Sequence, residues 1–201
     1  MTFPKVADTL PKRHSFLLEA IARFAFTRLG WQVIGEIPNV PQFVAVAAPH
    51  TSSRDFYLGM LLIFGLGLRV SWMGKHTLFR WPIGSIMRWL GGLAIDRSGR
   101  HKVVDQVVQV FATEPRLIVG LMPEGSRKRA GVPVKEWKTG FYYIALGAQV
   151  PILPLCINNA SKQMIFGPLL QPTGNMDADL AHLQEFYTKA AEDSVINRIK
   201  R

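Results

Sequence analysis

The sequence predicts an α/β fold in which a mostly parallel central sheet carries helices on both faces and is preceded by an amphipathic N-terminal helix. Short runs that are too apolar to have a solvent face alternate with longer segments of helical periodicity. The chain has 201 residues, 48% of them apolar and 19% charged, which suits one domain with its own core. Because strands alternate with helices, the sheet should be largely parallel and covered on both sides.

Residues 14–29 form the first predicted helix. Polar side chains recur along it at every fourth position, at Ser15, Glu19, Arg23 and Thr27. The other positions are largely apolar, so the apolar face is wider than the polar one, and basic residues flank it. Such a helix either packs into the core or lies in a membrane interface, and both interpretations stay open. We treat residues 1–30 as an N-terminal amphipathic helical segment and 31–201 as the α/β domain.

The first half of the domain is predicted to alternate strands with helices. The strands are expected at 31–37, 42–48, 69–73 and 93–95. The helices between them are expected at 53–64 and 82–90, with a loop or partial helix at 75–79. Gly65 and Gly67 end the first of these helices, and Pro82 stands at a tolerated first position of the second. Strand 42–48 has no polar face, so it belongs in the centre of the sheet.

The second half continues the alternation. Strands are expected at 116–122 and 150–157, with a last edge strand at 162–166, and helices at 101–112, 136–148 and 177–197. The uncharged stretch 139–161 is long enough to cross a membrane, but Pro151 and Pro154 interrupt it, so a helix followed by a strand explains it better. No clear transmembrane span is therefore predicted. No signal peptide is predicted either, because the first residues lack a basic start followed by an apolar run.

Composition narrows the choice of partners. The net charge is +10, from 24 Lys and Arg against 14 Asp and Glu, which calls for a nucleic acid, an anionic membrane face or a phosphorylated metabolite. The basic residues do not gather into an arm, and no basic-aromatic or zinc-finger motif is present, so specific nucleic-acid binding is not expected. The single Cys156 cannot form an internal disulfide, which favours a reducing compartment, and it is interpreted as a small buried hydrophobe.

The turn His50-Thr51-Ser52-Ser53-Arg54-Asp55 lies between the central strand 42–48 and helix 53–64. With His50 in the turn and Asp55 in the first helical turn, the carboxylate can fold back to the imidazole, fix its tautomer and stabilise the imidazolium. A second interpretation stays open: Ser52 and Asp55 also have the spacing of a helix capping box.

No motif in the sequence identifies a catalytic nucleophile. A G-x-S-x-G elbow is absent, and so are H-E-x-x-H and a carboxylate-rich metal cluster. A base without an enzyme nucleophile would activate a hydroxyl that a substrate brings.

Two further polar loops follow predicted strands. In Pro123-Glu124-Gly125-Ser126-Arg127, Gly125 lets the backbone approach a ligand and Arg127 offers a fork for phosphate; the alternative is a turn with an exposed ion pair. Asp96-Arg97 repeats this pattern after strand 93–95 more weakly. Because ligands bind beyond the carboxyl ends of parallel strands, the three loops are expected to share one site.

Together these motifs resemble the glycerolipid acyltransferases typified by 1-acylglycerol-3-phosphate acyltransferase. Residues 50–55 match the family's H-x-x-x-x-D block, and residues 92–97 resemble its second block, an apolar strand that ends in Arg. Residues 122–128 resemble the third block, Phe-Pro-Glu-Gly-Thr-Arg-Ser, and residues 150–154 match the fourth, Val-Pro-Ile-x-Pro. Four blocks in the family's order are far more specific than one. The departures are Met122 for Phe, Ser126 for Thr and Lys128 for Ser.

The resemblance implies roles for these residues. His50 would deprotonate the hydroxyl of a lysophospholipid and Asp55 would orient His50. The groups implied to hold the phosphate and glycerol of the acceptor are Arg97, Glu124, Gly125, Ser126 and Arg127. The attacked group would be an acyl thioester of coenzyme A or acyl carrier protein. The resemblance implies neither a metal nor a redox cofactor.

The acceptor implied by the resemblance is 1-acylglycerol-3-phosphate, which would give phosphatidic acid for phospholipid biosynthesis. Another lysolipid, such as lyso-ornithine lipid, is an alternative acceptor, and a non-catalytic binder of anionic lipid is an alternative function. The resemblance also implies a peripheral protein on the cytoplasmic face of the cell membrane, because both lipids live there and the net charge fits an anionic leaflet.

Overall fold

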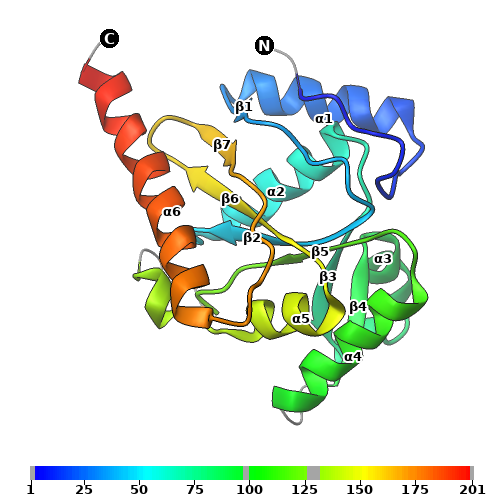
Figure 1. The fold of residues 1–201 in the computed structure, drawn as a ribbon. Helices are drawn as coiled ribbons and strands as arrows, with labels where there is room; N and C mark the ends of the chain where they lie inside the picture. The colour runs from blue at the N-terminus through cyan, green and yellow to red at the C-terminus, as the bar shows by residue number, and fades with distance from the viewer. Residues whose placement is uncertain (1–2, 97–99, 126–131, 200–201) are drawn as a thin grey trace.

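The computed structural model describes residues 3–96, 100–125 and 132–199 (Figure 1). Its strands are β1 (Gln32–Ile34), β2 (Gln42–Ala48), β3 (Val70–Lys75), β4 (Gly92–Ile95), β5 (Leu117–Leu121), β6 (Ile152–Asn158) and β7 (Gln163–Phe166). They form one sheet in the order β1-β7-β6-β2-β5-β3-β4. Among the strand pairs of the described ranges, only β6 and β7 run antiparallel. The predicted α/β fold with a mostly parallel sheet is confirmed.

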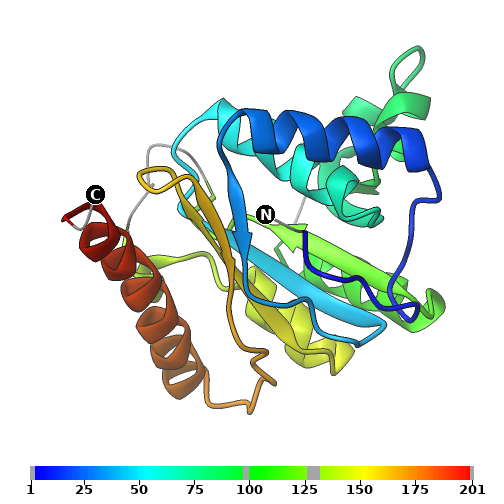
Figure 2. The ribbon, with the colours of Figure 1, turned by 90° about the horizontal axis from the view of Figure 1, so that it is seen from above.

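Helices cover both faces of the sheet. They are α1 (Phe16–Arg28), α2 (Ser53–Gly65), α3 (Gly84–Trp89), α4 (Arg100–Thr113), α5 (Gly140–Ala148) and α6 (Met176–Ile199), with short 3₁₀ turns η1 (His76–Phe79) and η3 (Val134–Glu136). Helices α1 and α2 lie on one face, and α4, α5 and α6 on the other (Figures 1 and 2). No helix in this described part of the chain is both long and apolar enough to cross a membrane.

The central strand β2 divides the core in two because successive side chains of a strand point to opposite faces. Val44 and Val46 are fully buried beneath α4, α5 and α6, whereas Phe43 is buried on the face that carries α1 and α2. On the first of these faces, Tyr187 of α6 donates its hydroxyl to the carbonyl of Val46 at 2.6 Å. This bond attaches the last helix to the strand that leads into the predicted catalytic turn.

Helix α1 packs into the core on one side, and its position in a membrane interface stays a prediction. Its Ala22 and Phe26 are each 1% exposed and pack in the core with α2. Its opposite side leaves Phe16 87% and Phe24 69% exposed, together with Leu17 and Ile21. The helix is therefore part of the core on one side and an apolar surface on the other.

Two predicted elements were wrong in extent. The first strand was expected at 31–37 but β1 ends at Ile34, because Gly35 adopts φ +86 and a Cβ there would lie 2.6 Å from the carbonyl oxygen of Phe166. The helix expected at 136–148 begins only at Gly140, because Trp137 is extended with ψ 158 after the 3₁₀ turn η3. The second difference places Lys138 in a loop, beside the predicted site.

Candidate functional site

The predicted catalytic turn lies in the middle of the carboxyl edge of the sheet, between β2 and α2. Ser52 caps α2: its hydroxyl accepts from the backbone N–H of Arg54 at 3.2 Å, and the Asp55 carboxylate accepts from the backbone N–H of Ser52 at 2.7 Å. The capping box is therefore present, and it is the same carboxylate that faces His50. The two interpretations of the sequence describe one arrangement.

Asp55 is fully buried, and most of its contacts with the turn end on one oxygen. Its Oδ2 accepts from the backbone N–H of Thr51 at 2.6 Å and from that of Ser52 at 2.7 Å, and lies 3.2 Å from His50 Nδ1. With Nδ1–H donating to this carboxylate, Nε2 is the nitrogen of His50 that can accept a proton. The His50 side chain is 19% exposed, so a substrate hydroxyl can reach the ring.

Glu124 supports the same turn from the neighbouring strand. β2 and β5 are adjacent and parallel, so their carboxyl ends lie side by side. Glu124 follows β5, is 1% exposed, and accepts the backbone N–H of His50 on Oε2 at 2.5 Å. The sequence placed Glu124 among the groups that hold the acceptor. The contact seen here is with the backbone of His50, and a direct role toward substrate stays a prediction.

Gly125 turns the chain at this edge with φ +73, a conformation that glycine adopts without cost. A Cβ at this position would overlap the side chain of Lys138, which therefore lies against the turn. The backbone N–H of Lys138 donates to the carbonyl of Pro123 at 2.9 Å. Lys138 brings a cation to the site that sequence reasoning missed, because the predicted helix 136–148 enclosed it.

Asn159, just after β6, is a second residue that the sequence did not indicate. Its side-chain amide donates to the hydroxyl of Thr51 at 3.2 Å, so the ends of β2, β5 and β6 all contribute to the His50 turn. The predicted Arg97, Ser126 and Arg127 lie outside the described residues. In the ranges that the structure covers, no cluster of three or more His, Cys, Asp or Glu could hold a metal ion.

An apolar cavity of about 240 Å³ lies beneath α2 and touches Asp55. Its roof consists of Phe56, Gly59, Met60 and Ile63 of α2, and its floor is formed by side chains of β2, β3, β5, β6 and β7. Met122 lies near its catalytic end, and Phe43, Leu153 and Phe166 near the opposite ends of the strands. The cavity thus follows the strands, the longest of which, β2 and β6, have seven residues each and are about 20 Å long at some 3.3 Å per residue.

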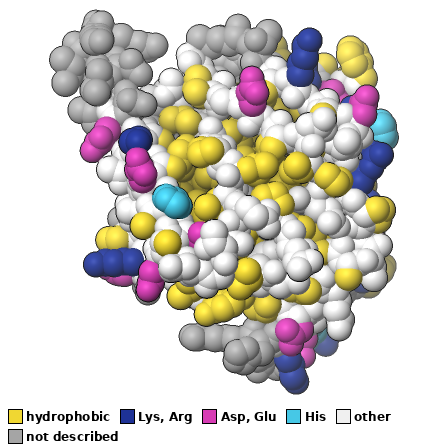
Figure 3. Space-filling view, in the orientation of Figure 1, with side chains coloured by type: hydrophobic (Ala, Val, Ile, Leu, Met, Phe, Trp, Pro, Cys, Tyr) yellow, Lys and Arg dark blue, Asp and Glu magenta, His cyan; other side chains and the backbone are white. Residues whose placement is uncertain are grey.

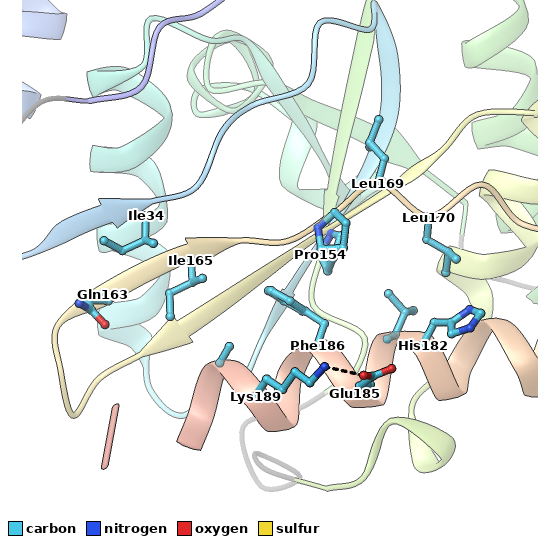
Figure 4. Close-up of a pocket in the computed structure, with 13 residues that line it drawn as sticks. Ile34, Pro154, Gln163, Ile165, Leu169, Leu170, His182, Glu185, Phe186 and Lys189 are labelled. Carbon is cyan, nitrogen blue, oxygen red and sulfur yellow. Dashed lines mark hydrogen bonds and ion pairs between the residues drawn. The ribbon is translucent and has the colours of Figure 1, made fainter. Parts of the chain in front are cut away.

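A larger groove of about 670 Å³ lies elsewhere, between α6 and strands β1, β6 and β7 (Figures 3 and 4). Ile165 of β7 faces this groove, whereas its neighbours Met164 and Phe166 face the cavity beneath α2, so the two hollows are on opposite faces of the sheet. An ion pair of Glu185 with Lys189 lies along its rim. Of the predicted site residues that the structure describes, none lines the groove, whereas Asp55 lines the smaller cavity.

Comparisons with known proteins show which proteins the chain resembles. The sequence profile of the family described as Acyltransferase matches residues 34–158. The 1-acyl-sn-glycerol-3-phosphate acyltransferase of Salmonella typhimurium is 36% identical over 96 residues, which are 46% of this chain and 38% of that protein. The enzyme of the same name from Haemophilus influenzae is 30% identical over 138 residues, 67% of this chain and 57% of that one. The chain thus matches well under two thirds of the length of these relatives.

A solved structure shares the fold. The crystal structure of the 1-acyl-sn-glycerophosphate acyltransferase from Thermotoga maritima superposes with a TM-score of 0.61, at 21% sequence identity, over 88% of this chain and 78% of that one. The family profile, for its part, spans the His50 turn, the Glu124 turn and β6, which are the segments that meet at the site. The chain belongs to the Acyltransferase family.

Proposed function

We propose that this protein transfers a fatty acyl group from an acyl thioester to the free hydroxyl of a lysophospholipid, with 1-acylglycerol-3-phosphate as the acceptor and phosphatidic acid as the product. The observation that carries the proposal is that Asp55 belongs both to the His50 pair and to the wall of an apolar cavity. A base and a chain-sized apolar hollow thereby meet at one carboxylate.

The proposed reaction uses the geometry of the turn directly. His50 Nε2 takes the proton of the acceptor hydroxyl as its oxygen attacks the thioester carbonyl. The tetrahedral intermediate then collapses, the carbon–sulfur bond breaks, and the departing thiolate receives the proton from the imidazolium. Asp55, 3.2 Å from Nδ1, stabilises the imidazolium between these two transfers. The products are an ester and a free thiol, so no further reactant is needed.

The acceptor phosphate suits the positive edge of the site. Lys138 lies against the Gly125 turn, and Arg97, Ser126 and Arg127 remain predicted partners of the phosphate. Arg forks and Lys ammonium groups both bind phosphate oxygens well. The net charge of +10 further favours an anionic acceptor and an anionic cytoplasmic leaflet, where the exposed apolar side of α1 would dock.

A substrate panel tests the proposal. Purified protein is incubated with acyl-coenzyme A or acyl-acyl carrier protein, and with lysophosphatidic acid, lyso-ornithine lipid or glycerol 3-phosphate as acceptor. We expect a diacyl product from lysophosphatidic acid. If only lyso-ornithine lipid gave a product, that lipid would replace 1-acylglycerol-3-phosphate as the proposed acceptor. Folded protein that acylates no acceptor, while binding anionic vesicles, would show a non-catalytic lipid binder instead.

The cavity beneath α2 should hold the acyl chain, and Gly59 offers a way to test this. Gly59 lines the cavity, and a Cβ added there would meet no heavy atom within 4 Å. Gly59→Leu should therefore fill the hollow without displacing the fold, and leucine is also a better helix former by roughly 0.5–1 kcal/mol. We expect at least a tenfold loss of kcat/KM for long-chain donors, the scale of effect of excess methylenes in an apolar pocket, and little loss for short-chain donors.

Gly59→Ala is the matched variant, since it adds one methyl group and should give a smaller shift in the same direction. Chain-length profiles of the wild type and both variants, measured with a series of saturated acyl donors, provide the readout. An unchanged preference for long chains in a folded Gly59→Leu protein would show that the chain lies elsewhere.

A further inference from the structure

The segment from η1 to α3 presents large apolar side chains to solvent. Its Trp81 is 93% exposed, and its other exposed members are Leu78 (41%), Ile83 (47%), Ile86 (55%) and Trp89 (56%). We call these five side chains the Trp81 surface. Apolar residues scattered singly are normal on proteins, but five large exposed ones within twelve residues of chain are typical of an interaction site.

The segment that carries the Trp81 surface is fixed to the domain by the buried Phe79. Phe79, between Leu78 and Trp81, is 6% exposed and packs against Trp72 with ring centroids 6.2 Å apart. Gly84 lies so close to the backbone of Phe79 that a Cβ there would overlap its carbonyl oxygen. The guanidinium of Arg88 also donates to that carbonyl at 3.4 Å. The turn is therefore anchored at Phe79, while Trp81 projects from it.

The segment that carries the Trp81 surface has charges of one sign. From 56 to 95 the sequence has four cationic residues, Arg69, Lys75, Arg80 and Arg88, and no Asp or Glu. Arg80 and Arg88 adjoin the apolar members directly and are exposed. Tryptophan beside arginine suits the headgroup level of a bilayer, where the ring is half desolvated and the cation meets anionic lipid.

The Trp81 surface is continuous with the N-terminal helix. Arg13, just before α1, places its guanidinium 4.6 Å from the ring centroid of Trp89 and donates to the carbonyl of Trp89 at 2.7 Å. Figure 2 shows α1 and the η1–α3 segment on the same side of the molecule. Trp72, which supports Phe79, lines the cavity beneath α2, so that cavity lies next to this surface.

We propose that the Trp81 surface inserts into the interface of an anionic bilayer, as a second membrane contact beside the exposed side of α1. The choice of lipid as partner rests on the proposed function, whereas the placement of the contact rests on exposure and charge. Contacts on both α1 and η1–α3 fix the protein on the membrane in one orientation. In that orientation the cavity beneath α2 lies between the two contacts, close to the acyl chains of the lipids.

Site-specific fluorescence tests the contact. Trp81→Cys is labelled with an environment-sensitive fluorophore. The native Cys156 does not compete, because it is 3% exposed and burial raises the pKa of its thiol to about 11. Labels at Phe24→Cys on α1 and at Tyr143→Cys on α5 serve as reporters, the latter 49% exposed and on the other face of the sheet.

Vesicles of phosphatidylglycerol with phosphatidylcholine should shift the emission of the labels at 81 and 24 to the blue and leave the label at 143 unchanged. Pure phosphatidylcholine vesicles should give weaker shifts. A shift at 24 without one at 81 would overturn the inference, because the protein would be bound with the Trp81 surface in water. A shift at 81 with acyl carrier protein and none with vesicles would also overturn it, in favour of a protein partner.

Unlabelled variants exclude an effect of the fluorophore. In vesicle sedimentation, Trp81→Ser should bind about tenfold more weakly, as expected when part of a tryptophan side chain is no longer withdrawn from water. Trp81→Phe should restore most of the binding and Tyr143→Ser should leave it unchanged. Equal binding by Trp81→Ser would contradict the inference. Acyl transfer to detergent-dispersed lysolipid is measured separately, so a missing activity counts against the proposed function and leaves the membrane result standing.

Discussion

Replacement of His50 by alanine should reduce acyl transfer by about 10³-fold, the typical contribution of a positioned general base. The loss arises because no other described side chain contacts Asp55 Oδ2 with a group that can take up the hydroxyl proton at neutral pH. Initial rates with acyl-coenzyme A and lysophosphatidic acid give the measurement, and kcat should fall far more than KM changes.

The fold of His50→Ala should survive. Asp55 keeps its bonds from the backbone N–H groups of Thr51 and Ser52 in the variant, and Glu124 bonds to the backbone of residue 50, which any residue supplies. Thermal melting should therefore lie close to that of the wild type. Rates within tenfold of wild type in this folded variant would remove His50 from the role of base.

Replacement of Asp55 by asparagine should lower kcat by about 10²-fold or more. The amide oxygen can take the place of Oδ2 and still accept from Thr51 and Ser52, so the turn should keep its shape. The negative charge that stabilises the imidazolium is lost, and in a comparable histidine–aspartate pair the same replacement keeps the geometry but leaves the imidazole in the wrong tautomer. Steady-state kinetics with saturating donor measure the change.

Two further variants separate the effect of the Asp55 charge from its effect on the shape of the turn. Asp55→Ala should lose activity and also about 1–3 kcal/mol of stability, because it leaves buried N–H groups unsatisfied and removes part of the helix cap. Asp177→Asn, in the first turn of α6 and exposed, is the matched control and should alter neither. Wild-type kcat in Asp55→Asn would show that the carboxylate serves the helix alone.

The sequence was sufficient to predict features formed by residues that are close together along the chain. His50 and Asp55 lie five residues apart across a strand-to-helix turn, and such a short segment has few ways to fold. The block order also brought Glu124 to the same edge, because parallel neighbours such as β2 and β5 end together. The direction in which Glu124 points, toward the backbone of His50, could not be read from its spacing.

Features made by distant segments were not predictable in this way. The cavity beneath α2 is assembled from α2 and several strands, and each contributes only ordinary apolar residues. Lys138 was missed because the helical pattern of α5 appeared to begin earlier than it does, and only the extended Trp137 reveals the break. The position of β1 beside β7, at the edge of the sheet, depends on pairing between residues about 130 apart in sequence.

The capping box at the start of α2 couples unfolding of the first helical turn to loss of the His50–Asp55 contact. The bond that closes the first turn of the helix and the bond that orients the imidazole end on the same carboxylate oxygen. Helix ends fray more readily than helix centres unfold. Each fraying event at Ser52 would thus also disconnect His50 from its partner. The proposed acyl transfer would then stop for as long as one turn of helix is open, while the rest of the domain stays folded.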